Sequence, residues 1–172
     1  MTSLYSMVER PDLESPVLIM ALKGWIDAGL GADGAAEVLR DQLEPTTVAR
    51  FDADVLLDWR ARRPTMRLVD GVNTQVTWEE TELSWAKDGL GHDLLLLFGN
   101  EPDHAWLAFS EQVIDLAEDL GVRMVVGLGA YPTPVPHTRR NSLPDNDVEN
   151  GTQLRVRRAA VVRFRSGSTE RR

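Results

Sequence analysis

Short apolar runs recur along the first 128 residues and predict a set of buried strands. Runs of four to eight apolar residues between turn signals suit strands that are covered on one or both faces. The runs predict strands at residues 17–22, 46–51, 81–85, 92–98 and 122–128, a short strand or turn at 55–59, and a hairpin of residues 66–69 and 74–78 around the turn pair Asp70-Gly71.

Two segments have the composition or periodicity of helices. Residues 30–43 are rich in small and apolar side chains and lie between the first two predicted strands. A second helix is predicted to begin after Asp103, a residue type that caps helices well, and to end at Gly121. Its apolar positions recur every three or four residues: Trp106, Phe109, Val113, Leu116, Ala117 and Leu120.

The order of these elements indicates the fold class. Each predicted helix joins two strands, and strand–helix–strand units place their strands parallel. We therefore predict an α/β fold, a three-layer αβα sandwich with a mostly parallel central sheet. A chain of 172 residues is long enough to bury a sizeable core for one such domain.

Three corners where strands end are the candidate sites, because open α/β sheets bind ligands or partners beyond the carboxyl ends of their strands. The candidates are Gly24, Trp25 and Asp27 after the first strand, Glu101 and His104 after the strand at 92–98, and His137 and Arg139 after the strand at 122–128. Glu101 and His104 suit cation binding or proton transfer, although a turn before a helix has the same composition. The last pair suits an anion, and an exposed loop looks the same.

The net charge of −8 is unevenly distributed. Residues 1–138 hold 10 Lys and Arg against 23 Asp and Glu, and residues 139–172 hold 9 Arg against 4 acids. The acidic body argues against nucleic-acid binding. Within it, Arg62 and Arg63 belong to a basic cluster that suits an anion pocket or a subunit contact, with pairing to neighbouring acids as the default.

The sequence gives little support for a cofactor or metal site. Gly29, Gly31 and Gly34 spell G-x-G-x-x-G before a helix and Asp52 ends the next strand, the pattern of a dinucleotide site. However, residues 23–28 separate the first strand from the first glycine, and close packing of a helix on a sheet also explains the glycines. The chain has no cysteine and no helical pair among its three histidines, so we predict neither a cofactor nor a metal site.

Localisation follows from two absences in the sequence. No apolar run approaches the roughly 20 residues of a membrane span, and the first 15 residues lack the apolar centre of a signal peptide. We therefore predict a cytoplasmic protein without a membrane partner.

Seven ordered motifs resemble the PAC2 family, the proteasome assembly chaperone 2 relatives of archaea and actinobacteria. They are Gly24-Trp-Ile-Asp-Ala-Gly29, Phe51-Asp-Ala-Asp54, Arg60-Ala-Arg-Arg-Pro64, Asp70-Gly71, Leu96-Leu-Phe-Gly-Asn-Glu-Pro102, Leu120-Gly-Val122 and Pro136-His-Thr-Arg139. The resemblance implies a phosphorylase/hydrolase-like domain. It also implies a protein-binding, chaperone-like module rather than an enzyme, with proteasome-related partners and a homo-oligomeric state.

The chain departs from the family pattern after about residue 140, where it becomes rich in arginine. Family members continue there with further strands and a helical region. We therefore interpret residues 1–140 as an incomplete PAC2-like domain and residues 141–172 as a basic, disordered tail of a truncated or frameshifted product, with a short edge strand at 159–162. Two other functions stay open: a small-molecule enzyme or sensor for a nucleotide or carboxylate, and a non-functional truncated copy.

Overall fold

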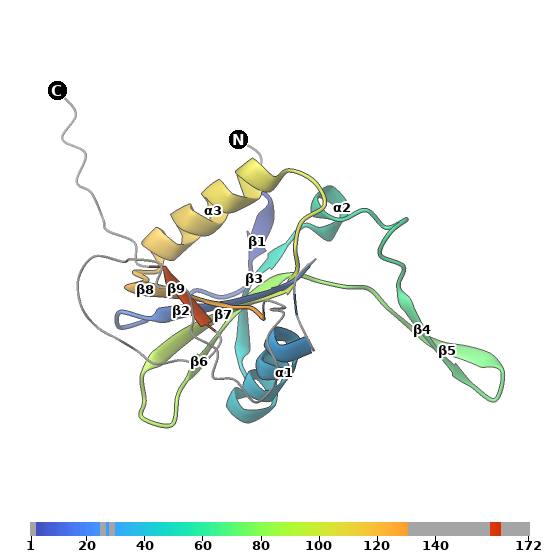
Figure 1. Ribbon diagram of the computed structural model, residues 1–172, viewed down its shortest axis with the longest axis horizontal. Coiled ribbons are helices and arrows are strands. Elements are labelled where there is room, and N and C mark those ends of the chain that lie inside the picture. Colours follow the sequence, from blue (N-terminus) through green and yellow to red (C-terminus); the bar gives the residue numbers. More distant parts are fainter. Residues whose placement is uncertain (1–2, 25–26, 28–29, 131–158, 163–172) are drawn as a thin grey trace, which may run out of the picture.

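The computed structural model describes residues 3–24, 27, 30–130 and 159–162, the last four by their main chain. The strands are β1 Tyr5–Met7, β2 Val17–Lys23, β3 Thr46–Phe51, β4 Thr65–Val69, β5 Val72–Thr77, β6 Glu82–Lys87, β7 Asp93–Asn100, β8 Met124–Leu128 and β9 Ala159–Val162. The helices are α1 Gly31–Leu43, α2 Ala53–Leu56 and α3 Trp106–Asp119. Figure 1 shows how they are arranged.

A seven-stranded sheet in the order β1-β3-β6-β7-β2-β8-β9 forms the centre of the fold. Its middle strands β7, β2 and β8 are parallel, and their neighbours on both sides pair in antiparallel fashion. The α/β fold class is thus confirmed, with a mixed sheet around a parallel centre. The predicted edge strand at residues 159–162 is present as β9, paired with β8.

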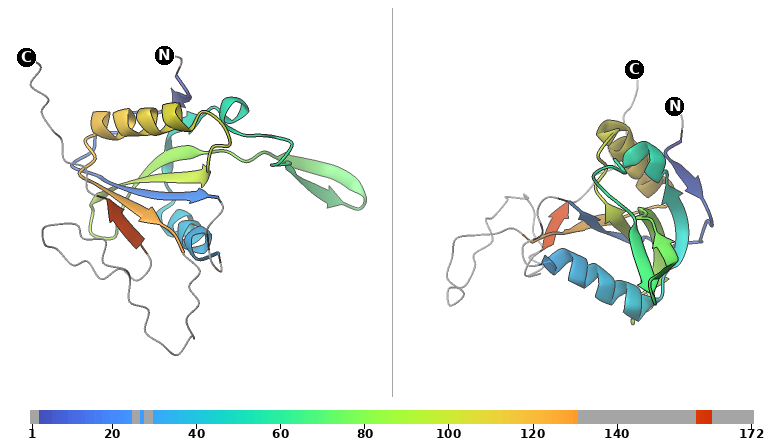
Figure 2. Two further views of the ribbon diagram at one scale, coloured as in Figure 1. Left: turned by 45° about the horizontal axis from the view of Figure 1, so that its top comes forward. Right: turned by 90° about the vertical axis from the view of Figure 1, so that its right-hand side faces the viewer.

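Helices cover both faces of the sheet, with α3 on one side and α1 on the other (Figures 1 and 2). The strand β7 shows why its apolar run is continuous. Leu95 and Leu97 belong to the core cluster that contains Phe109 of α3, whereas Leu96 and Phe98 pack in the cluster on the α1 side. Because successive side chains of a strand point to opposite faces, a strand covered on both needs apolar residues at every position.

Two predictions of local structure are wrong. Residues 55–59 do not begin as a strand, because Asp52 caps the short helix α2: its carboxylate accepts the N–H groups of Asp54 at 3.0 Å and Val55 at 3.3 Å. Asp103 does not cap α3, because the N-cap position is held by Ala105, which lies in the left-handed region with φ 55°. The predicted end of α3 is confirmed, since Gly121 has φ +70°.

The hairpin of β4 and β5 extends away from the rest of the molecule (Figures 1 and 2). It forms its own two-stranded sheet, and every residue of both strands is exposed. The predicted turn is present, with φ +51° at Asp70 and φ +80° at Gly71. Positive φ at both central residues belongs to the turn type that matches the twist of hairpin strands.

Among the helices that the structure describes, none combines the length and apolar composition that a bilayer crossing requires.

Candidate partner-binding rim

The carboxyl ends of β2 and β7 lie side by side and bring two predicted corners together. Lys23 is the register partner of Asn100, and the Glu101 N–H donates to the Lys23 carbonyl at 2.9 Å. A Cβ atom on Gly24 would overlap the Glu101 carboxylate, so the absence of a side chain on Gly24 leaves the space in which that carboxylate lies. Gly24 and Glu101 therefore share one rim.

The third corner, after β8, adjoins the same rim. Ala130 of that corner forms a parallel bridge with Asp27 of the first corner. Three other predicted site residues, Trp25, His137 and Arg139, lie outside the described residues, and their roles stay predictions. We use the name "rim" below for Lys23, Gly24, Asp27, Asn100, Glu101 and Ala130.

Asp27 has a structural role at the start of α1. Its Oδ1 accepts the Ala32 N–H at 2.9 Å and its Oδ2 accepts the Asp33 N–H at 3.0 Å. These main-chain bonds, the Ala32 bond first, hold the pKa of Asp27 below its usual value. The carboxylate occupies the position at the helix N-terminus where a dinucleotide-binding fold places its pyrophosphate.

Among the described residues, the glycine pattern after Asp27 gives no support to a phosphate site. A Cβ on Gly34 would meet no neighbouring atom within 4 Å, and Asp52 is engaged in capping α2. Lys23, a cation close to the start of α1, pairs with Asp33 at 3.1 Å. In the described part of this corner, the N–H groups at the start of α1 and the Lys23 ammonium group are thus bonded to side chains of the chain itself.

Arg62 and Asp103 form the strongest ion pair of the site. The guanidinium donates from Nε to Oδ2 at 2.8 Å and from Nη2 to Oδ1 at 3.0 Å, a two-pronged geometry that is stronger than a single bond. This hydrogen bond with Asp103 raises the pKa of Arg62, and the same bond lowers the pKa of Asp103. The Asp103 Oδ2 also accepts the Asp58 N–H at 2.9 Å, which ties the segment after α2 to the loop before α3.

Arg62 extends this network to the rim. Its Nη1 donates to Asn100 Oδ1 at 3.2 Å and its Nη2 to the Glu101 carbonyl at 3.4 Å. The sequence predicts Arg62 and Glu101 in separate candidate sites, and the structure brings them together. Arg63 is exposed in the segment that leads to β4.

Sequence reasoning did not identify Asn100, which organises the buried end of β7. The residue is 4% exposed, and its side chain donates from Nδ2 to Glu79 Oε2 at 3.1 Å. Its main-chain N–H donates to Thr81 Oγ1 at 3.0 Å, and its carbonyl accepts from the same hydroxyl at 3.1 Å. The signal in the sequence that indicates such a role is a polar residue at the end of an otherwise apolar strand.

Exposed side chains lie on α2 and at the start of α3, the latter close in sequence to Asp103. The Leu56 carbonyl accepts the N–H groups of Asp103 at 2.8 Å and His104 at 3.1 Å, which holds α2 against the loop that enters α3 (Figure 1). We call this region the α2–α3 surface: Val55, His104, Trp106 and Leu107, all exposed. Leu107, in the first turn of α3, is 82% exposed.

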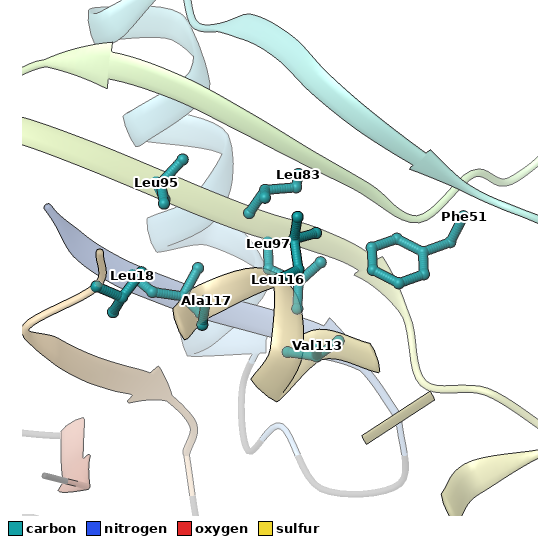
Figure 3. A pocket seen from close by; sticks show the side chains of 9 residues that line it. Leu18, Phe51, Leu83, Leu95, Leu97, Val113, Leu116 and Ala117 are labelled. Carbon is teal, nitrogen blue, oxygen red and sulfur yellow. The ribbon is translucent and has the colours of Figure 1, made fainter. Parts of the chain in front are cut away.

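The described interior contains a small cavity. A cavity of about 10 Å³ lies between α3 and the sheet (Figure 3), a volume of about one water molecule. Its lining is entirely apolar: Leu18, Phe51, Leu83, Leu95, Leu97, Val113, Leu116, Ala117 and Val122. Across the described ranges, no group of three or more His, Asp and Glu side chains is arranged to hold a metal ion.

Comparison with known proteins finds one matching family model and several similar solved structures. The family model described as "PAC2 family" matches residues 21–160. A Mycobacterium tuberculosis protein of unknown function is 42% identical with a TM-score of 0.74, over 80% of this chain and 49% of its own. The proteasome-assembly chaperone homologue of the same organism is 32% identical with a TM-score of 0.64, over 72% of this chain and 52% of its own.

The fold is also similar to that of a more distant structure. The archaeal proteasome activator PbaB from Pyrococcus furiosus is 23% identical with a TM-score of 0.56, over 77% of this chain and 52% of its own. The chain thus spans about half the length of these structures. No curated protein shows a significant sequence match to it.

Proposed function

The chain belongs to the PAC2 family, and on this premise we propose that it is a protein-binding module similar to proteasome assembly chaperones, not an enzyme. We further propose that it acts in the cytoplasm as a homo-oligomer and that its partners are proteasome subunits. The observation that carries the proposal is its 32% identity to a proteasome-assembly chaperone homologue over 72% of the chain.

The α2–α3 surface supports binding to a protein. Exposed aromatic and aliphatic side chains next to charged groups have the composition of an interface, because apolar contacts contribute affinity and the surrounding charges contribute specificity. Trp106 and Leu107 follow Asp103 by three and four residues, and the Arg62–Asp103 pair is fixed by several hydrogen bonds. A partner would therefore meet a largely preformed surface.

The alternative of an anionic small-molecule ligand receives less support. The first N–H groups of α1 donate to Asp27, which removes the main anion-binding feature of that corner. Arg62 is likewise bonded to Asp103, Asn100 and the Glu101 carbonyl.

Purified components test the proposal directly. The chain is mixed with proteasome α- and β-subunits encoded in the same genome, and complexes are measured by size-exclusion chromatography with light scattering. We expect the wild type to co-elute with at least one subunit. Leu107→Asp should weaken that complex at least tenfold, because a carboxylate would be buried in an apolar contact.

Leu90→Asp is the matched control, since Leu90 is 84% exposed in the turn between β6 and β7, away from the α2–α3 surface. It should bind as the wild type does. Failure of the wild type to co-elute with any subunit would contradict the proposed partners, and equal losses in both variants would contradict the proposed surface.

A further inference from the structure

The β4–β5 hairpin has one mostly apolar face. Met66 is paired with Val76, and the register shift beyond Arg67 leaves the extra residue in β5, at Thr74. The strand β4 is regular, and alternate residues of a strand point to the same side, so Leu68 shares the face of Met66 and Val76. The exposed fractions are 56% for Met66, 61% for Leu68 and 42% for Val76.

The hairpin and the segment that leads into it form the basic part of an acidic molecule. Residues 59–78 hold four Arg and one Asp, whereas the rest of residues 1–138 holds 6 Lys and Arg against 22 Asp and Glu. Arg60, Arg63 and Arg67 form no ion pair with any residue that the structure describes. An exposed apolar face close to unpaired charges has the composition of a contact surface.

The outer side of α3 is complementary to this hairpin. It carries an exposed stripe at the helical spacing i, i+4, i+7, i+8 and i+11, made up of Leu107, Glu111, Ile114, Asp115 and Glu118. The two apolar members are 82% and 38% exposed, and the whole helix contains four acids and no basic residue. The three acids of the stripe form no ion pair within the described part of the chain.

We infer that the apolar hairpin face of one copy docks on the α3 stripe of a second copy, head to tail. Within one copy the two surfaces lie apart, because the hairpin extends away from the domain and α3 covers the sheet (Figures 1 and 2). In the contact, Met66, Leu68 and Val76 pack against the two apolar residues of the stripe. The arginines of residues 59–78 attract its acids across the hairpin, since the screening length in physiological salt is about 8 Å.

The inference rests on the homo-oligomer proposed above and names its contact. Such a contact joins two different surfaces, so each copy gives one hairpin and receives one. Leu107 also belongs to the α2–α3 surface, so a second copy and a proteasome subunit compete for it. Self-association therefore covers part of that surface until a partner displaces the hairpin.

Light scattering of the full chain across a range of concentrations tests the contact. We expect the wild type to self-associate, and to do so less tightly in high salt, where the charges are screened. Leu68→Asp should weaken self-association at least tenfold, because it places a carboxylate in an apolar contact that faces the acids of α3. Val69→Asp is the matched control. It adds the same charge one residue later, on the opposite face of β4 at a position 45% exposed, and should self-associate as the wild type does.

Ile114→Lys tests the receiving surface and should weaken self-association by a similar factor, because it removes an apolar contact and repels the arginines. An equimolar mixture of Leu68→Asp and Ile114→Lys should associate again. The first variant keeps an intact α3 stripe and the second keeps an intact hairpin, so one head-to-tail contact forms between them. A contact between two identical surfaces would not be restored in this way.

The outcomes separate this inference from the proposed function. A monomeric wild type would overturn both this contact and the proposed homo-oligomer. Equal effects of Leu68→Asp and Val69→Asp, or a mixture that stays monomeric, would overturn the hairpin contact alone. Failure of the wild type to bind any proteasome subunit would overturn the proposed function and leave the contact standing.

Discussion

Arg62 and Asp103 are 41 positions apart in the sequence, yet they join the segment after α2 to the loop before α3. The pair is about three-quarters shielded from solvent, with both side chains 26% exposed. Its bonds are therefore screened less than those of a surface ion pair. We expect it to contribute to stability as well as to the shape of the α2–α3 surface.

Asp103→Asn should lower the free energy of unfolding by about 1–2 kcal/mol at pH 7, because charge-assisted bonds are replaced by weaker neutral ones. The pKa of Asp103 is lowered in the folded protein, so its contribution is complete above the unfolded value of about 4. As the pH falls through the folded pKa, that contribution is lost. Urea unfolding at several pH values should show the difference between variant and wild type shrinking in acid; a difference that is equal at pH 7 and in acid would refute it.

Gly99 is a second residue whose identity the structure requires. It has φ +146°, and a Cβ atom there would overlap the main chain of Thr81. Gly99→Ala should therefore lower the free energy of unfolding by about 3 kcal/mol, from backbone strain together with overpacking.

Gly34→Ala is the matched control for Gly99→Ala. Gly34 lies in α1, and a Cβ there meets no atom within 4 Å. The substitution should raise stability by about 0.5–1 kcal/mol, because alanine favours helices. Thermal or urea unfolding of both variants measures the contrast. Equal effects of the two substitutions would show that the packing around Gly99 is not as described.

The sequence predicted where candidate site residues lie better than it predicted which bonds their side chains make. The sequence identified Gly24, Asp27, Glu101 and Arg62 as candidates, and the structure brings all four to the rim and its immediate neighbourhood. It did not predict that Asp103 bonds to Arg62 instead of capping α3. Both uses suit an aspartate, and only tertiary contacts decide between them.

At the scale of elements, α1 depends on a residue outside the helix. Its N-cap residue Leu30 has no side-chain acceptor, and Asp27 supplies both oxygens from three residues earlier. Asp27→Ala should lower stability by about 1 kcal/mol, as loss of a cap does. It should also increase hydrogen exchange in the first turn of α1.

The exposed residue Asp41, near the other end of α1, gives the control for Asp27→Ala. Asp41→Ala should not lower stability, because alanine favours helices and an acid is unfavourable near a helix C-terminus, and it should leave exchange in the first turn unchanged. If both substitutions have the same effect, the carboxylate of Asp27 does not hold the start of α1.

Most elements could be predicted because their patterns are strong. The strand β7 is apolar at nearly every position since both of its faces are covered, and α3 repeats its apolar residues at helical spacing. The strand β1 was missed because Tyr5–Met7 is short and mostly exposed, which leaves no periodic signal. The pairing of β3 and β6 joins distant segments, so local patterns did not predict their antiparallel direction.

At the scale of the whole molecule, we expect the domain and its hairpin to contribute separately to stability. The hairpin buries no residue of its strands, and its base is marked by the edge-to-face contact of Trp59 and Trp78 with ring centroids 4.8 Å apart. Thr65 and Thr77 are directly paired, so a two-residue Asn-Gly turn can replace residues 66–76.

This shortened chain should unfold at the same midpoint as the wild type, within a few degrees, when both are measured by circular dichroism. A large drop in the midpoint would show that the hairpin is part of the cooperative core.

The sheet order also has a consequence for synthesis on the ribosome. The strand β2 ends at Lys23, but its two neighbours β7 and β8 begin only at Asp93 and Met124. The centre of the sheet therefore stays open until most of the domain has emerged, and the chain cannot complete it in the order in which it is made. Late closure of this kind makes folding slow and leaves an apolar strand exposed in the nascent chain.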